Sequence, residues 1–126
     1  MTAPNITAEF LYRYRATCVR VVDGGTVILK VSLGFFASLD IRARLYGINA
    51  PELRGATYEM GRVSRDYLRG LLFEGDKPRE LLIRTHKDNT DKYGRTIAEI
   101  AVVTSKGLLD VNASMVEQGF ALRVVS

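Results

Sequence analysis

Three short segments of the sequence concentrate residues that can bind anions, move protons or hold cations. Asp23 lies in the first segment (23–26), Arg44 and Glu52 begin and end the second, and Arg95 ends the third (91–95). A guanidinium group binds oxyanions through parallel hydrogen bonds and stays charged at all working pH values. A carboxylate can accept a proton or bind a hard cation. The residue types therefore permit acid–base chemistry on an anionic substrate.

Taken singly, these residues have simpler explanations. Asp23 suits a turn in which its side chain bonds its own backbone. Arg44 suits a solvated strand face, Glu52 a loop, and Arg95 a strand edge. Only the complete set, in its order along the chain, points to a shared site.

The elements that must position these residues begin with a hairpin. Tyr12 to Val22 is rich in β-forming residues, and so is Thr26 to Leu33. Apolar and polar residues alternate in both runs, as in half-buried strands. Asp23-Gly24-Gly25 between them is a strong turn signal. The two runs are therefore predicted to pair as a β-hairpin.

The rest of the chain alternates between strand and helix patterns. In Tyr58 to Leu72 the apolar residues recur at helical spacing, with Val63, Tyr67 and Leu68 in the predicted buried stripe. Asp110 is a plausible N-cap of a short helix through Gln118. The other predicted segments are a loop at 34–39, a strand at 40–48, a strand at 79–85, a loop at 87–93 and a strand at 95–103.

The predicted element order is β-β-β-α-β-β-α. Five strands with a helix between the third and fourth are typical of the OB-fold, whose surface commonly binds oligonucleotides. We therefore predict a mainly β fold with helices (α+β): a five-stranded OB-fold barrel with a helix between strands 3 and 4 and a short helix after strand 5.

Composition agrees with one small globular domain. The 126 residues, 47% of them hydrophobic, are enough for one core and predict a single domain over 1–126, with its core at about 12–125. No apolar run is long enough to cross a membrane, and residues 1–10 lack the pattern of a secretory signal, so a cytoplasmic location is expected. Cys18 is the one cysteine and is expected to be a packing residue. The net charge of +4 favours an anionic partner, nucleic acid first.

Four ordered motifs resemble one known family. They are Asp23-Gly24-Gly25-Thr26, the run from Arg44 to Glu52, the run from Asp91 to Arg95, and a final pair formed by Val111-Asn112 with Gln118 to Ala121. This pattern is similar to the staphylococcal-nuclease-like (thermonuclease, micrococcal nuclease) family over nearly the whole chain. The resemblance implies an OB barrel with helices, and calcium-dependent hydrolysis of phosphodiester bonds in DNA, preferentially single-stranded, and in RNA.

The resemblance also implies roles for single residues. Arg44 would bind the phosphate, Glu52 would be the general base for the attacking water, and Arg95 would stabilise the charge that develops on the phosphoryl oxygens. Tyr93 would pack beside the nucleotide, and Lys92 would suit a backbone phosphate. Charge stabilisation is the main demand in reactions at phosphorus, which these residue types meet.

The implied metal site departs from the family pattern. Two positions where the family has acidic ligands hold Gly25 and Asn49. Asn49 keeps one carbonyl oxygen but not the charge, Ala50 can still supply its backbone carbonyl, and Asp23 and Glu52 would act on the metal through water. Calcium prefers hard oxygen ligands, and its affinity falls with the number of charged ligands. The sequence therefore predicts a weak divalent-cation site, for calcium with reduced affinity or for another divalent ion.

Three functions remain open from the sequence. The first is a metal-dependent nuclease, based on Arg44, Glu52 and Arg95. The second is a nucleic-acid-binding module of the same fold with weak or no cleavage, based on Gly25 and Asn49. The third is a protein-interaction domain that would use the aromatic pair Phe35-Phe36. Covering the barrel core is the expected role of that pair, and His86 is assigned no role.

Overall fold

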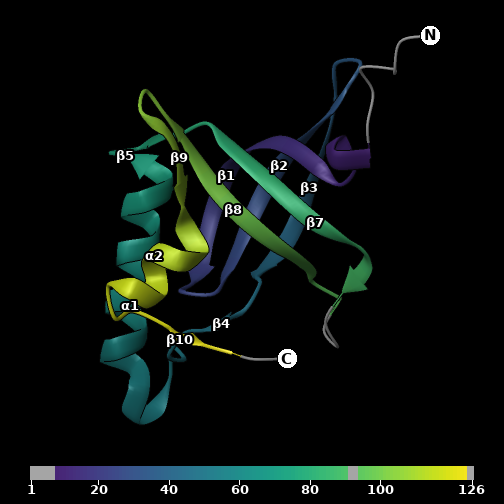
Figure 1. Ribbon diagram of the computed structural model, residues 1–126. Coiled ribbons are helices and arrows are strands. Elements are labelled where there is room, and N and C mark those ends of the chain that lie inside the picture. Colours follow the sequence, from purple (N-terminus) through teal and green to yellow (C-terminus); the bar gives the residue numbers. More distant parts are fainter. Residues whose placement is uncertain (1–7, 91–93, 125–126) are drawn as a thin grey trace, which may run out of the picture.

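The computed structural model describes residues 8–90 and 94–124, which form a β-barrel with helices packed against one end (Figure 1). The barrel strands are β1 (Arg13–Asp23), β2 (Thr26–Gly34), β3 (Ala37–Leu45), β7 (Leu81–Thr90) and β8 (Thr96–Thr104). They are hydrogen-bonded in the order β3-β2-β1-β7-β8, and β3 also pairs in parallel with β8. This last pairing closes the sheet, so the predicted five-stranded barrel is confirmed.

The helices and short strands lie between and after the barrel strands. The remaining elements are η1 (Ala8–Phe10), β4 (Ile48–Asn49), η2 (Gly55–Thr57), α1 (Tyr58–Leu72), β5 (Phe73–Glu74), β6 (Lys77–Pro78), β9 (Gly107–Asp110), α2 (Val111–Glu117) and β10 (Leu122–Arg123). Helix α1 lies between the third and fourth barrel strands, and α2 follows the fifth, which confirms the OB-fold class. No helix within the described residues is long and apolar enough to cross a membrane.

The core fills the barrel with alternate residues of each strand. Val27, Leu29 and Val31 of β2 are buried, while Lys30 between them is exposed. Cys18 of β1 is also buried, at 2% exposure, and this burial raises the pKa of its thiol to about 11. The thiol therefore stays protonated and apolar at neutral pH, which agrees with a packing role.

Helix α1 approaches the barrel through small residues. Its buried residues are Gly61, Ser64, Leu68 and Leu72. A Cβ at Gly61 would lie 2.6 Å from the carbonyl oxygen of Glu52, so only glycine permits this contact. Val63, predicted in the buried stripe, is 45% exposed. The apolar pattern was misleading here, because close approach selects small residues over large ones.

The tip of the β2–β3 hairpin differs from the prediction. Strand β3 begins at Ala37, so the expected loop 34–39 is reduced to a tight turn at Phe35 and Phe36. Both residues have positive φ, 54° and 62°, in a region that favours glycine. Both side chains are fully exposed. They do not cover the core, because the two strands carry them beyond the end of the barrel.

Two further strand boundaries were predicted incorrectly, and one strand was missed. Strand β7 runs to Thr90, where the sequence predicted a loop from 87, and 91–93 lie outside the described residues. Strand β3 ends at Leu45, before Gly47 with its positive φ of 76°. Strand β9 was not predicted at all. Asp110 does cap α2, since its Oδ1 accepts a hydrogen bond from the Ala113 amide at 3.0 Å.

Candidate active site

One open cleft gathers the predicted site residues at the helical end of the barrel. It has a volume of about 830 Å³. Its lining residues are Asp23, Gly25, Thr26, Arg42, Arg44, Asn49, Ala50, Pro51, Glu52, Arg54 and Arg95. Of the predicted residues, Lys92 and Tyr93 lie outside the described residues. The fold thus brings together residues as far apart in the sequence as Asp23 and Arg95.

Helix α1 holds two of these segments in place. A Cβ at Gly24, in the turn between β1 and β2, would collide with the Ser64 hydroxyl oxygen. Gly61 contacts the backbone at Pro51 and Glu52. The Ser64 hydroxyl donates to the Phe120 carbonyl at 2.8 Å, which ties α1 to the chain after α2. Glycine at positions 24 and 61 is therefore required for the cleft walls to approach the helix.

Arg44 is held by acceptors on three sides. Its Nη1 donates to the Gly25 carbonyl at 3.0 Å, and its Nη2 donates to the Ile48 carbonyl at 2.9 Å and to Asn49 Oδ1 at 3.1 Å. A Cβ at Gly25 would collide with Nη1 of Arg44. The missing side chain at position 25 therefore makes room for this position of the guanidinium group.

Arg95 lies beside Arg44 because β3 and β8 are parallel. Ala43 pairs with Thr96 and Arg44 with Ile97, which places both arginines at the same end of the barrel. Nη1 of Arg95 donates to Thr26 Oγ1 at 3.1 Å, and Thr26 is 2% exposed. The start of β2 therefore supports Arg95, while the turn before it supports Arg44.

Glu52 presents its carboxylate to solvent at the edge of the cleft. Its side chain is 67% exposed, and Oε2 accepts a hydrogen bond from Arg54 Nε at 2.9 Å. An ion pair so exposed contributes little free energy, so Glu52 can leave it at little cost. The Thr57 hydroxyl donates to the Glu52 carbonyl at 2.8 Å, which fixes the backbone rather than the carboxylate.

A scan against protein-family models matches residues 42–126 to the staphylococcal nuclease homologue family. The chain belongs to this family. A search of curated proteins finds no match. The family match begins at Arg42, after the turn Asp23–Thr26. The hydrogen bonds from Arg44 to Gly25 and from Arg95 to Thr26 place that turn in the same cleft.

Membership in the staphylococcal nuclease family gives the cleft a general function. The family is generally one of nucleases, and its fold is a nuclease-like or nucleic-acid-binding one. Family members are typically calcium-dependent. Calcium binding by this chain depends on the oxygen ligands that its own cleft supplies.

Hydrogen bonds already engage one oxygen of each predicted side-chain ligand of calcium. Asp23 Oδ1 accepts from the Gly25 amide at 2.8 Å, while Asn49 Oδ1 and Glu52 Oε2 accept from arginines. Calcium takes six to eight oxygen ligands. Among the residues that the structure describes, no group of three or more His, Cys, Asp or Glu side chains could hold a metal. A guanidinium group also repels a second cation at the same oxygens.

Arg42 and Arg54 add positive charge that the sequence did not assign to the site. Both line the cleft, and both are exposed. Arg42 shares the outer face of β3 with Arg44, so strand alternation alone identifies it as a neighbour. Arg54 follows Glu52 by two positions in an irregular segment, where no periodicity predicts its direction.

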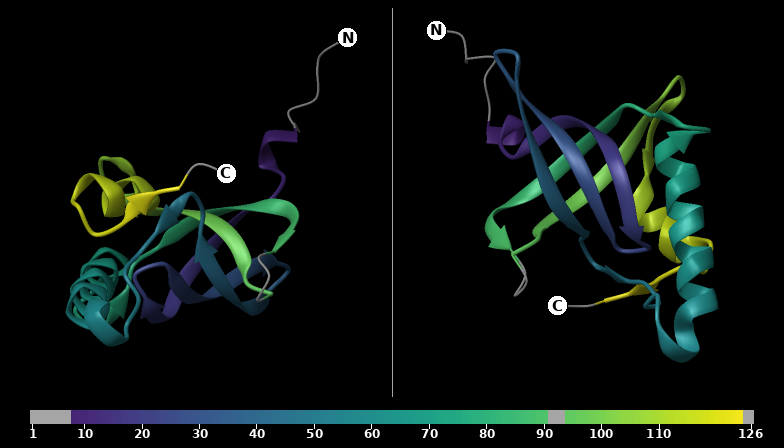
Figure 2. Two further views of the ribbon diagram at one scale, coloured as in Figure 1. Left: turned by 90° about the horizontal axis from the view of Figure 1, so that it is seen from below. Right: turned by 180° about the vertical axis from the view of Figure 1, so that it is seen from behind.

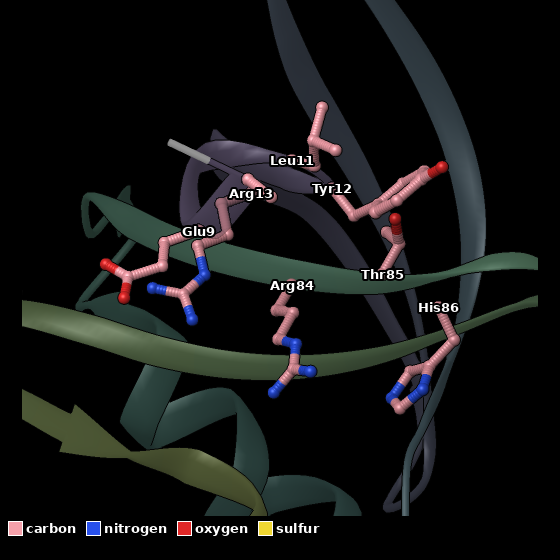
Figure 3. Close-up of a pocket in the computed structure, with 8 residues that line it drawn as sticks. Glu9, Leu11, Tyr12, Arg13, Arg84, Thr85 and His86 are labelled. Carbon is pink, nitrogen blue, oxygen red and sulfur yellow. The ribbon is translucent and has the colours of Figure 1, made fainter. Parts of the chain in front are cut away.

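A second hollow, of about 700 Å³, lies at η1 between β1 and β7 (Figure 3). Arg13 and Arg84 face each other there across the antiparallel strands. His86 also lines this hollow, and its ring stacks on Tyr46 with centroids 4.4 Å apart. None of the predicted site residues lines this hollow, so the cleft that contains Arg44 and Arg95 is the candidate active site.

Proposed function

We propose that this chain is a nuclease that hydrolyses phosphodiester bonds in single-stranded DNA or RNA. The observation that supports this most is that Arg44, Arg95 and Glu52 line one open cleft. Two guanidinium groups beside one solvent-accessible carboxylate supply charge stabilisation and a proton acceptor, which are the two demands of water attack on a phosphodiester.

Each residue has a defined task in this proposal. Arg44, held by its three acceptors, binds a phosphate oxygen in a fixed position. Arg95 binds the same phosphate and stabilises the negative charge that develops during attack. Glu52 accepts the proton of the attacking water. When the substrate phosphate attracts the guanidinium group of Arg54, the Glu52 carboxylate is released from its ion pair.

In this proposal, the chain differs from its family in its metal site, where Gly25 and Asn49 replace acidic ligands. One oxygen each of Asp23, Asn49 and Glu52 is engaged in a hydrogen bond, so we expect divalent cations to bind weakly. The dependence of the cleavage rate on the concentration of the divalent cation measures this requirement.

A nucleic-acid-binding module without cleavage is the second candidate. The hydrogen bond from Arg44 to Asn49 Oδ1 favours it, because a cationic group already lies at one of the oxygens that are predicted to bind a catalytic metal. Under this alternative, Arg44 and Arg95 still bind phosphate, but no water is activated.

A cleavage assay separates the two candidates. Single-stranded DNA and RNA are incubated with calcium, magnesium, manganese or a chelator, over a range of metal concentrations. Cleavage that is lost in Glu52→Gln and Arg95→Ala supports the nuclease. Lys106→Ala, which removes an exposed charge in the β8–β9 turn, is the matched control. Binding without cleavage in any metal contradicts the nuclease and supports the binding module.

A further inference from the structure

A bulge in β1 turns one arginine to the outside of the barrel. Cys18 pairs with Leu29, but Arg20 pairs with Ile28, so one extra residue, Val19, lies between the two pairs. Regular alternation would place Arg20 on the core side, together with Cys18. With the bulge, Arg20 is exposed and Val21 is buried instead. Such bulges redirect side chains and are common beside functional sites.

The redirected arginine completes a row across three strands. Arg20 of β1 lies opposite Ile28 of β2, and Ile28 lies opposite Arg42 of β3. We call these three residues the outer row. Adjacent strands are about 4.8 Å apart, so the two arginine backbones are separated by roughly 10 Å. Ile28 is half-buried between them.

The outer row carries a positive charge at each of its two ends. Arg20 and Arg42 are exposed and form no ion pair with any residue in 8–90 or 94–124. Lys30, the next outward residue of β2, is also exposed and lies opposite Asp40. In the view from behind, β1, β2 and β3 lie in front and the helices stand at the edge (Figure 2, right). The face is therefore open to a ligand.

The outer row is continuous with the cleft. Arg42 lines the cleft together with Arg44, which is two residues further along the same face of β3. Arg20 does not line the cleft, so the row extends the positive surface beyond it along the barrel wall. A strand that leaves the cleft in this direction meets Arg42 first and Arg20 next.

We propose that the outer row binds the phosphate backbone of the nucleic-acid strand next to the phosphate held in the cleft. This inference rests on the proposed function, because it assumes that nucleic acid is the ligand of the cleft. The positive charge of the row favours a polyanion, and Ile28 offers an apolar contact between the two arginines that bind phosphate. The row contacts no defined base edge, so it adds affinity without sequence preference.

The experiment compares ligands that fill the cleft with ligands that extend beyond it. Fluorescence anisotropy measures binding of a labelled thymidine dinucleotide and of a long oligothymidylate, at several salt concentrations, to the wild type, Arg20→Ala and Lys106→Ala. Arg20→Ala is expected to weaken long-strand binding by about fivefold at low salt and to leave the dinucleotide unchanged. The slope of log affinity against log salt falls by about 0.7, the value of one contact to a single strand.

Two further variants keep the outcome clear. Arg20→Lys keeps the charge and should retain most of the affinity, whereas Arg20→Glu should weaken long-strand binding more than Arg20→Ala. Circular dichroism verifies that each variant is folded. If Arg20→Ala matches Lys106→Ala on the long strand, the inference is wrong while the proposed function stands. If the wild type binds neither ligand, the proposed function fails and the inference fails with it.

Discussion

Arg44 and Arg42 lie two residues apart on the same face of β3, yet their surroundings differ. Arg44 donates to Gly25, Ile48 and Asn49, whereas Arg42 is exposed and forms no ion pair within the described part of the chain. A guanidinium group held by the barrel keeps one position before a ligand arrives. An exposed one must be ordered by the ligand and contributes mainly long-range attraction. The cleft therefore combines a positioned cation with an adaptable one.

The largest expected effect separates these two arginines by alanine substitution. Arg44→Ala should lower kcat/KM on single-stranded substrate by about 10²- to 10³-fold, the range found when a preorganised donor is lost. Arg42→Ala should cost less than about tenfold, mostly through KM. Steady-state cleavage kinetics measure both. Equal losses would show that the hydrogen bonds of Arg44 bring no catalytic advantage.

Lysine substitution sharpens the same contrast. Arg44→Lys cannot reach three acceptors and a phosphate with one ammonium group, so activity should still fall by about tenfold to a hundredfold. Arg42→Lys keeps the charge of an exposed site and should stay within about twofold of the wild type. The same kinetics provide the measurement. Full activity with lysine at position 44 would show that only the positive charge of Arg44 matters, and not its hydrogen bonds.

Acidic substitutions at the metal site should affect Arg44 and leave Arg42 in place. In Gly25→Asp with Asn49→Asp, the new side chain at position 25 displaces the Arg44 guanidinium, and two carboxylates become available to a cation. Calcium affinity should rise by about tenfold or more, since it follows the number of charged ligands. Isothermal titration calorimetry measures it. Unchanged calcium binding would mean that the metal site has been misplaced.

The smallest effect on activity is expected at the far end of the same hairpin. Phe35→Asn with Phe36→Gly suits the positive φ angles of the turn and should raise the free energy of unfolding by about 1–2 kcal/mol. Urea denaturation measures this gain. Cleavage should stay within about twofold of the wild type, because the tip is remote from the cleft. A larger loss of cleavage would add the aromatic tip to the substrate-binding surface.

The alternation of apolar and polar residues predicted the barrel strands, and the order of the motifs predicted that the site residues lie together. Apolar residues such as Val27 and Leu29 alternate with polar ones, and this period assigns faces without any tertiary information. Arg44, Glu52 and Arg95 were predicted from their motifs, and the structure lines one cleft with them. Their catalytic roles remain predictions. Barrel closure was expected from the fold class, not from a pairing signal between β3 and β8.

The missed features depend on contacts between distant segments. The bulge at Val19 redirects Arg20, but nothing in the local pattern distinguishes it from a regular strand. Gly61 is buried because it meets the Glu52 backbone, whereas a helical pattern of apolar residues selects larger neighbours. The turn at Phe35 and Phe36 lacks the glycine and asparagine that usually announce such geometry.

Because Cys18 is buried, the reactivity of its thiol can be used to measure opening of the barrel. Cys18 is the single cysteine in the sequence, and its thiol is both inaccessible and protonated at neutral pH. An alkylating reagent can therefore react only when β1 separates from its neighbours. The rate of modification, followed by mass spectrometry, measures that separation without any added label. Since β1 also carries Arg20, a long oligonucleotide bound to the barrel wall should slow the alkylation of Cys18.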